Sequence, residues 1–263
     1  MRGENRSILV LEQSQLNREI GATISLQPNA SKFVEREWGL GPELKKRGSM
    51  IDKAFRICSA DGKEHKRIDL AAKTDYGGDR MMYHRQDLHE VLKLAATSID
   101  GIGSPAEIRV RSRAVSCDCD AGSVVLENGE VLDGFDLIIA ADGIRSKLRQ
   151  SVLEEECNPV PTGQSAYRMM IKAADIEDDE EILKFLDPRE PVTTMVMGHN
   201  VRLIMGPARN GELFSIVAMV PDSKLHQFPA QYSLTKDTYS DDGSSGNIMD
   251  NRGEHGNSAS GIQ

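Results

Sequence analysis

The stretch from Gly134 to Arg149 constrains the fold more than any other part of the chain. Its first half, Phe135 to Ala141, is mostly apolar, which is typical of a short strand buried on both faces of a parallel sheet. The run ends at Asp142 and Gly143, and apolar positions four apart then indicate a helix. Open α/β sheets bind ligands at the carboxyl ends of their strands, where a glycine lets the backbone approach closely. An ordinary strand, turn and helix is the alternative interpretation.

Length, charge and hydropathy limit the class of protein. A chain of 263 residues can form one large domain or two small ones. A formal charge of −9 argues against a nucleic-acid partner, because binding to phosphates needs clustered Lys and Arg. No apolar run approaches the length of a transmembrane segment, and the N-terminal residues lack a signal-peptide core. We therefore expect a cytoplasmic protein.

The cysteines predict no metal site. Four are present, and their spacing lacks the two pairs of a zinc site, which suits a reducing compartment. Cys117 and Cys119 are two residues apart, so two side chains on one face of a strand is the favoured interpretation.

Before Gly134, short strands alternate with helices. Pro28 is placed to begin a helix, and Asp61 with Gly62 is typical of a hairpin turn. Apolar residues at helical spacing predict a helix that begins near Tyr83. The expected segments are a strand at 7–12, a loop, short strand and helix at 17–38, a second short helix ending at 46, a hairpin at 52–70, a helix from 83, and β-structure at 107–132.

After Arg149 the pattern changes to strands joined by short turns, which predicts an antiparallel sheet. From Ser233 onward the chain is rich in Ser, Gly, Asp and Asn, and such a composition predicts disorder. The expected strands are 163–173, 192–197, 201–205 and 213–220.

Several of these segments together resemble the flavoprotein monooxygenases of the aromatic-hydroxylase class, which includes salicylate and para-hydroxybenzoate hydroxylases. Asp142, Gly143, Arg145, Ser146 and Arg149 match the family's second fingerprint position by position. In that family the motif lies by the FAD pyrophosphate and is also associated with the pyridine nucleotide. The resemblance covers about residues 7 to 222.

The resemblance implies further FAD contacts in the first part of the chain. Glu12 matches an acid that accepts hydrogen bonds from the ribose hydroxyls. Gly21, Ala22 and Thr23 match a loop along FAD, with Thr23 in place of a common glycine. Arg85 matches an arginine that contacts the flavin nucleotide's phosphates, a role suited to the guanidinium fork. Without the resemblance, Arg85 would be interpreted as a surface residue.

Arg168, which follows Tyr167, matches an arginine with an active-site role near the flavin and the substrate. The alternative, an outward-facing residue on a strand, stays open.

The implied fold is α/β, with a Rossmann-like FAD-binding parallel sheet, an inserted β-meander and an antiparallel β substrate domain. The expected domains are a partial FAD-binding domain at 1–160, a partial substrate-domain sheet at 161–232 and a disordered tail at 233–263. The fold is expected to be incomplete, because the family's first strand with its Gly-x-Gly-x-x-Gly loop and its later Gly-Asp motif have no counterpart here.

The absence of a first strand has a physical consequence. That strand is central in the Rossmann order, so without it the strand at 7–12 and the strand before Asp142 lose their shared neighbour. We therefore expect weak FAD binding or poor folding unless a partner supplies the rest.

The activity implied by the resemblance is FAD-dependent monooxygenation of a small aromatic or secondary-metabolite substrate, with NADPH or NADH as electron donor. The alternative is a truncated, non-catalytic relative. An NAD-dependent reductase is a poorer third interpretation, because the sequence lacks the Gly-rich loop and neither Tyr83 nor Tyr167 has a Lys at helical spacing. Oligomeric state is not predicted.

Overall fold

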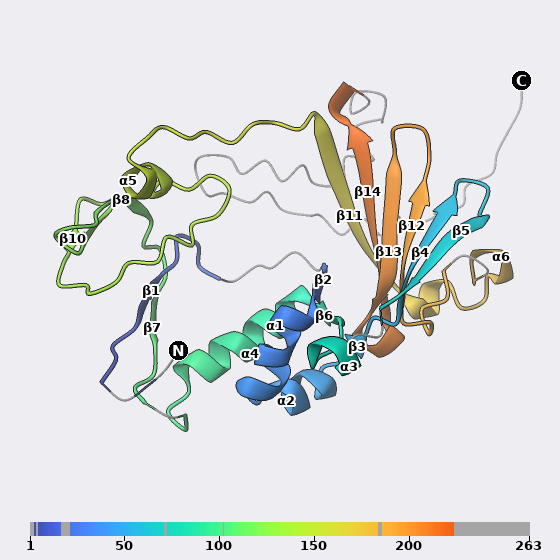
Figure 1. The fold of residues 1–263 in the computed structure, drawn as a ribbon, viewed down its shortest axis with the longest axis horizontal. Coiled ribbons are helices and arrows are strands. Elements are labelled where there is room, and N and C mark those ends of the chain that lie inside the picture. The colour runs from blue at the N-terminus through green and yellow to red at the C-terminus, as the bar shows by residue number, and fades with distance from the viewer. Residues whose placement is uncertain are drawn as a thin grey trace, which may run out of the picture. The chain divides into compact units, whose positions relative to one another are not determined.

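The computed structural model describes residues 3, 5–16, 22–70, 73–101, 103–183 and 186–223, all within one unit of the chain. The strands of these residues form sheets of six, three, three and two strands (Figure 1). This mixed arrangement agrees with the α/β class expected from the sequence. The predicted tail at 233–263 and the predicted cofactor residue Gly21 lie outside the described residues.

The largest sheet has the strand order β11-β14-β13-β12-β4-β5, with every pair antiparallel except β12 and β4. The four later strands were expected as an antiparallel sheet, and the early hairpin joins them through parallel pairing of Val192 with Ala54. The sequence could not predict this pairing, because it joins segments far apart in the chain. The strands are β4 (Ala54–Ser59), β5 (Glu64–Asp69), β11 (Gln164–Lys172), β12 (Val192–Met197), β13 (Arg202–Ala208) and β14 (Leu213–Pro221).

Short helical segments connect or flank these strands. They are α3 (Lys73–Tyr76), η2 (Ala173–Asp175), α6 (Glu180–Leu183) and η3 (Arg209–Gly211).

A second sheet, with the order β2-β6-β3, packs against helices. Pro28 stands in the first turn of α1, and Gly39 has a φ of +69° between the first helical segment and α2. Tyr83 belongs to β6 and not to the helix predicted from that residue, because β6 pairs with β2 and the helix begins at Arg85. The elements are β2 (Thr23–Leu26), α1 (Pro28–Lys32), η1 (Phe33–Glu37), α2 (Gly41–Lys46), β3 (Met50–Ile51), β6 (Met81–His84) and α4 (Arg85–Thr97).

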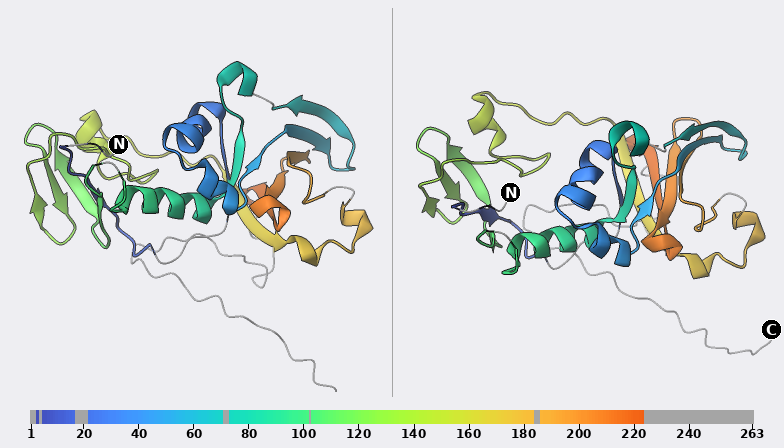
Figure 2. Two further views of the ribbon diagram at one scale, coloured as in Figure 1. Left: turned by 90° about the horizontal axis from the view of Figure 1, so that it is seen from below. Right: turned by 60° about the horizontal axis from the view of Figure 1, so that its bottom comes forward.

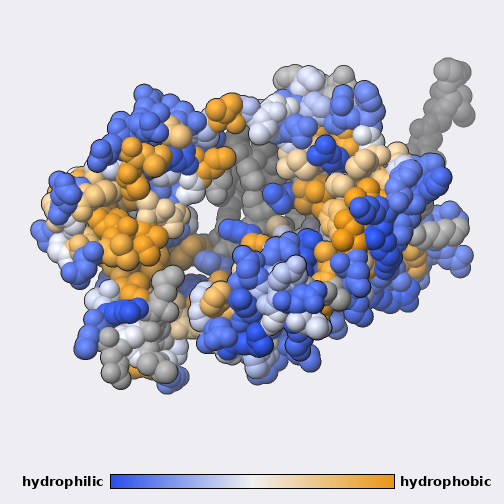
Figure 3. All heavy atoms as spheres, in the orientation of Figure 1, coloured by the Kyte–Doolittle hydropathy of each residue, from blue (hydrophilic) through white to orange (hydrophobic). Residues whose placement is uncertain are grey.

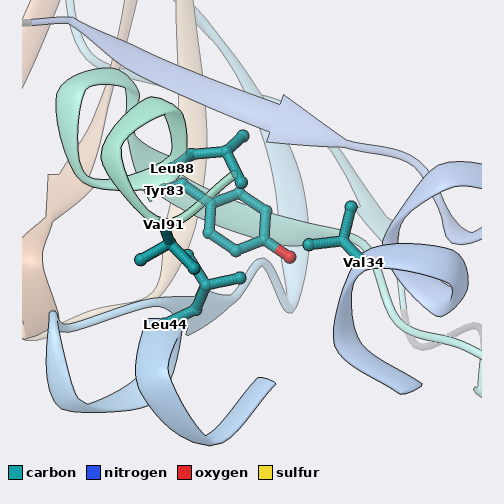
Figure 4. Packing of buried hydrophobic residues seen from close by; sticks show 5 residues of the cluster. All are labelled: Val34, Leu44, Tyr83, Leu88 and Val91. Atoms are coloured by element: carbon teal, nitrogen blue, oxygen red, sulfur yellow. The ribbon is translucent and has the colours of Figure 1, made fainter. Parts of the chain in front are cut away.

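The hydrophobic core of this part gathers around one tyrosine. The Tyr83 ring is almost fully buried, and its hydroxyl donates a hydrogen bond of 2.7 Å to Glu35 Oε1. Helices α2 and α4 contribute side chains to the same cluster (Figure 4). Its buried members are Val34, Leu44, Tyr83, Leu88 and Val91.

The remaining strands form two small sheets. Strands β1 and β7 pair in parallel, and β8, β9 and β10 form an antiparallel meander, as the pattern at 107–132 predicted. Helix α4 extends away from β6, and its end is joined to the start of β7 by a hydrogen bond from Ala106 N–H to the Ala96 carbonyl (Figure 2). The elements are β1 (Leu9–Leu11), β7 (Glu107–Arg109), β8 (Ala114–Asp118), β9 (Ser123–Leu126), β10 (Val131–Leu132) and α5 (Arg149–Leu153).

The prediction of a buried strand at Phe135 to Ala141 was wrong. This segment forms no strand, and 76% of Leu137 and 67% of Ile139 are exposed. A parallel strand is stable only beside another strand, and among the described residues the parallel sheet consists of β1 and β7 alone. Apolar surface is accordingly exposed in the part that holds β8 to β10 and α5 (Figure 3).

A buried carboxylate joins the six-stranded sheet to the segment around β3 and β6. Asp52 is fully buried and accepts hydrogen bonds from Thr193, at 2.7 Å from the hydroxyl and 3.2 Å from the backbone N–H. The Arg80 guanidinium lies 3.2 Å from the same carboxylate. Burial raises the pKa of Asp52, although Thr193 and Arg80 act in the opposite direction.

Truncating the core should destabilise the fold strongly. We expect Leu44→Ala to lower the free energy of unfolding by about 2–5 kcal/mol, because it leaves a cavity beside Tyr83. Leu94→Ala is the matched control, since Leu94 lies on α4 but is half exposed and should change stability by no more than about 0.5 kcal/mol. Urea denaturation followed by circular dichroism measures both, and equal losses would contradict the assignment of this core.

Asp52 should make stability depend on pH in a defined direction. Its raised pKa means that the folded state binds the proton more tightly, so this residue's contribution to stability falls as pH rises above 3.8. Asp52→Asn cannot titrate. The stability of the native chain relative to this variant should therefore decrease between pH 4 and pH 7, measured by urea denaturation at each pH. A difference that is constant or increases would contradict the raised pKa.

Candidate cofactor site

The start of β2 and the start of α4 are held together by a main-chain hydrogen bond. Arg85 N–H donates to the Ala22 carbonyl at 2.7 Å, and Thr23 pairs with His84 across β2 and β6. Ala22 is buried, whereas the Arg85 side chain is exposed. The structure thus brings together three of the residues that the sequence indicated as cofactor contacts.

The first turn of α4 offers favourable electrostatics for an anion. The amide groups of a helix N-terminus carry partial positive charge, and the N-cap residue His84 forms no side-chain cap with them. The guanidinium of Arg85 adds a full positive charge at the same end. A phosphate group therefore suits this position chemically.

Glu12 directly follows β1, as predicted for a residue at the end of a strand. Its backbone N–H donates to the Arg109 carbonyl at 2.9 Å, which extends the pairing with β7. Its carboxylate accepts a hydrogen bond of 2.7 Å from the backbone N–H of Ser14. The carboxylate therefore orders the turn after β1.

Asp142 organises the turn that follows the exposed apolar segment. Its carboxylate accepts hydrogen bonds from the Ser146 hydroxyl at 2.6 Å and from the amides of Lys147 and Leu148 at 2.7 and 3.1 Å. Desolvation opposes ionisation, but these hydrogen bonds outweigh it and lower the pKa of Asp142. Gly143 has a φ of +80° and open space around it, so the backbone conformation explains the glycine.

Arg149 completes this turn. Its guanidinium donates to the carbonyls of Gly143 and Ile144 at 3.2 and 2.9 Å, and to the carbonyl of Cys157 at 3.2 Å. The matched motif from Asp142 to Arg149 thus forms a loop closed by its own side chains.

Arg168 lies on β11 opposite Val217 of β14, with an exposed side chain. Tyr167 is partly buried, as expected for a neighbour on the other face of the strand. The described contacts of Arg168 do not join it to Arg85, Glu12 or Asp142.

Comparison with known proteins finds relatives of this chain among FAD-dependent monooxygenases. It is 33% identical over 211 residues to the FAD-dependent monooxygenase phomE' of Diaporthe leptostromiformis, covering 78% of this chain and 51% of that protein. It is 26% identical over 246 residues to hispidin-3-hydroxylase of Neonothopanus nambi, covering 89% and 57%. The chain belongs to the FAD-dependent monooxygenase family of the aromatic-hydroxylase type. No family model matches it.

Solved structures share the fold over part of their length. The crystal structure of CtdE in complex with FAD and substrate 4 is similar with a TM-score of 0.67 and 18% identity, covering 82% of this chain and 52% of that one. A Pseudomonas aeruginosa PqsL variant is similar with a TM-score of 0.65 and 17% identity, covering 85% and 56%. The chain spans about half the length of the curated relatives and of the solved structures that it matches.

Two other kinds of feature are absent from the residues that the structure describes. In the described residues no three His, Cys, Asp or Glu side chains gather in a geometry that could hold a metal ion. No helix in the same residues has both the length and the apolar character needed to cross a membrane.

Sequence reasoning missed one ion pair near the cofactor residues, between Arg209 and Asp87. These residues are 122 positions apart, and no motif in the sequence indicated the pairing. The pair borders a polar pocket of about 470 Å³ that Lys45, Arg47 and Glu212 also line.

Removing the Asp142 carboxylate should open its turn. We expect Asp142→Ala to speed tryptic cleavage after Lys147 at least severalfold, because the carboxylate no longer holds the Lys147 amide and the Leu148 amide of the cleaved bond. Asp136→Ala is the control, since Asp136 is exposed in the same segment and has none of these hydrogen bonds. Mass spectrometry of the early fragments measures the rates, and equal rates in the two variants would refute this role of Asp142.

Proposed function

We propose that this chain contributes the FAD-contacting and substrate-facing parts of a monooxygenase that hydroxylates or epoxidises a small aromatic or secondary-metabolite substrate. The observation that carries the proposal is the hydrogen bond between Arg85 and Ala22, which brings the candidate flavin loop beside a helix N-terminus. Family membership supports FAD as the cofactor. The electron donor in the proposal is NADPH or NADH.

In this proposal different residues bind different parts of FAD. Ala22 and Thr23 line the flavin, and Arg85 with the first turn of α4 receives phosphate oxygens. Glu12 accepts hydrogen bonds from ribose hydroxyls once its carboxylate leaves the Ser14 amide. Bound FAD supplies the oxygen chemistry, whereas the protein orients it and excludes water.

The remaining candidate residues lie in the turn at Asp142 and Gly143 and on β11. Gly143 lies in open space, so the backbone of its turn is accessible to the pyrophosphate, with Asp142 fixing the turn. Arg168 faces the substrate from β11 in this proposal. The exposed side chain is compatible with that role. The division into a FAD-binding part at 1–160 and a substrate part at 161–232 belongs to the same proposal.

A second candidate function is a non-catalytic relative of such enzymes. The observation that favours it is the exposed apolar segment Phe135 to Ala141, which has no strand beside it in the described residues. The pyrophosphate of a dinucleotide is held at the edge of a parallel sheet of several strands, whereas the one wholly parallel sheet of the described residues has two strands, β1 and β7. This chain would then retain the fold of the family without its activity.

FAD titration followed by the flavin absorbance bands tests the proposal. We expect saturable binding by the native chain, and a dissociation constant raised about tenfold or more by Arg85→Ala, since a charge-assisted hydrogen bond contributes about 1.5–3 kcal/mol. Lys66→Ala is the control, because Lys66 is an exposed cation on β5 and should leave the affinity unchanged.

The outcomes separate the two candidate functions. FAD binding followed by NADPH or NADH oxidation that a phenolic substrate stimulates would support the monooxygenase. A chain that folds cooperatively but binds no FAD at about 100 μM would refute the proposed function and favour the non-catalytic relative. If Arg85→Ala and Lys66→Ala weakened FAD binding equally, the assignment of Arg85 to the phosphate site would be refuted.

A further inference from the structure

The turn between β13 and β14 has an unusual backbone. Arg209, Asn210 and Gly211 have consecutive positive φ angles of 47°, 54° and 89°. Only glycine adopts this region without cost, so the conformation of Arg209 and Asn210 must be imposed by contacts elsewhere. Strained backbone of this kind gathers at positions whose geometry matters for function.

The contacts that impose this conformation come from α4 and from the end of α2. Arg209 Nε and Nη2 donate to the two carboxylate oxygens of Asp87 at 2.8 and 2.9 Å, which is a bidentate pair. Asn210 N–H donates to the Gly48 carbonyl at 2.9 Å. A Cβ at Gly48 would lie 2.6 Å from the Arg209 Cα, so the two segments pack without room for a side chain.

Asp87 places this ion pair next to the candidate cofactor site. It is buried in the first turn of α4, two residues after the Arg85 amide that is bonded to Ala22. An unpaired carboxylate at that position would repel an anion from the helix N-terminus. Arg209 cancels that charge and anchors the turn at the same time.

Other charged groups surround the pair but do not replace Arg209. His84 Nδ1 lies 3.6 Å from the Asp87 carboxylate and 3.5 Å from Arg209 Nη2. Arg47, from the end of α2, is already paired with Glu90 at 2.7 Å. Of these groups, Arg209 makes the bidentate contact to the Asp87 carboxylate.

We propose that Arg209 is a positioning residue for the cofactor, which acts through Asp87 to hold the first turn of α4 and the Ala22 loop in the geometry that receives FAD phosphates. The proposal rests on the proposed function for its FAD readout. Its structural part concerns the chain without cofactor and can be tested separately.

The experiment compares Arg209→Ala, Arg209→Lys and Asn210→Gly by FAD titration and by hydrogen exchange of the Arg85 amide in the cofactor-free chain. We expect Arg209→Ala to weaken FAD binding about tenfold and to speed exchange at Arg85 about tenfold. Arg209→Lys keeps the charge without the bidentate geometry. It should therefore restore only part of the FAD affinity and part of the protection of the Arg85 amide from exchange. Asn210→Gly relieves strain and keeps the ion pair, so it should change neither.

A double variant tests whether Arg209 acts through Asp87. Asp87→Asn combined with Arg209→Ala should weaken FAD binding no more than Arg209→Ala alone, because the two residues share one function. The proposal would be overturned if the double variant bound FAD more weakly than Arg209→Ala. It would also be overturned if Arg209→Ala left hydrogen exchange at the Arg85 amide unchanged. If the native chain binds no FAD, the proposed function fails, and the exchange measurement alone still decides the role of Arg209.

Discussion

The buried carboxylate of Asp52 is the interaction on which the arrangement of the sheets depends. It receives both the hydroxyl and the amide of Thr193, so the six-stranded sheet cannot move away from β3 and β6 without exposing these groups or leaving them unbonded. The ion pair between Arg209 and Asp87 repeats the same connection farther along the sheet. Two polar contacts therefore join the six-stranded sheet and its turns to β3, β6 and the first turn of α4.

Local sequence patterns predicted most elements, because their signals are local. Pro28 at a helix start, the Asp61-Gly62 hairpin and the short turn between β13 and β14 all depend on neighbours in the sequence. The parallel pairing of β12 with β4 was not predicted, since it depends on segments far apart. Phe135 to Ala141 shows the opposite case, in which an apolar pattern typical of a strand forms none because pairing requires a neighbour.

The candidate site was predictable to a similar extent. Family motifs indicated Ala22, Thr23 and Arg85, and the structure brings these three together. They did not reveal that the side chains of Asp142 and Arg149 form hydrogen bonds within their own turn. That outcome follows from hydrogen-bond geometry, which a sequence pattern does not contain. The ion pair of Arg209 with Asp87 could not be predicted for the same reason.

The exposed segment before Asp142 has a consequence for handling the protein. Leu137 to Ala141 is an uncharged, largely apolar run, which is the composition of sequences that stack into intermolecular β-sheets. Asp136 and Asp142 border this run on either side, and flanking charges of this kind oppose such stacking. The two carboxylates that oppose stacking of this segment therefore include one, Asp142, that also orders the turn that follows.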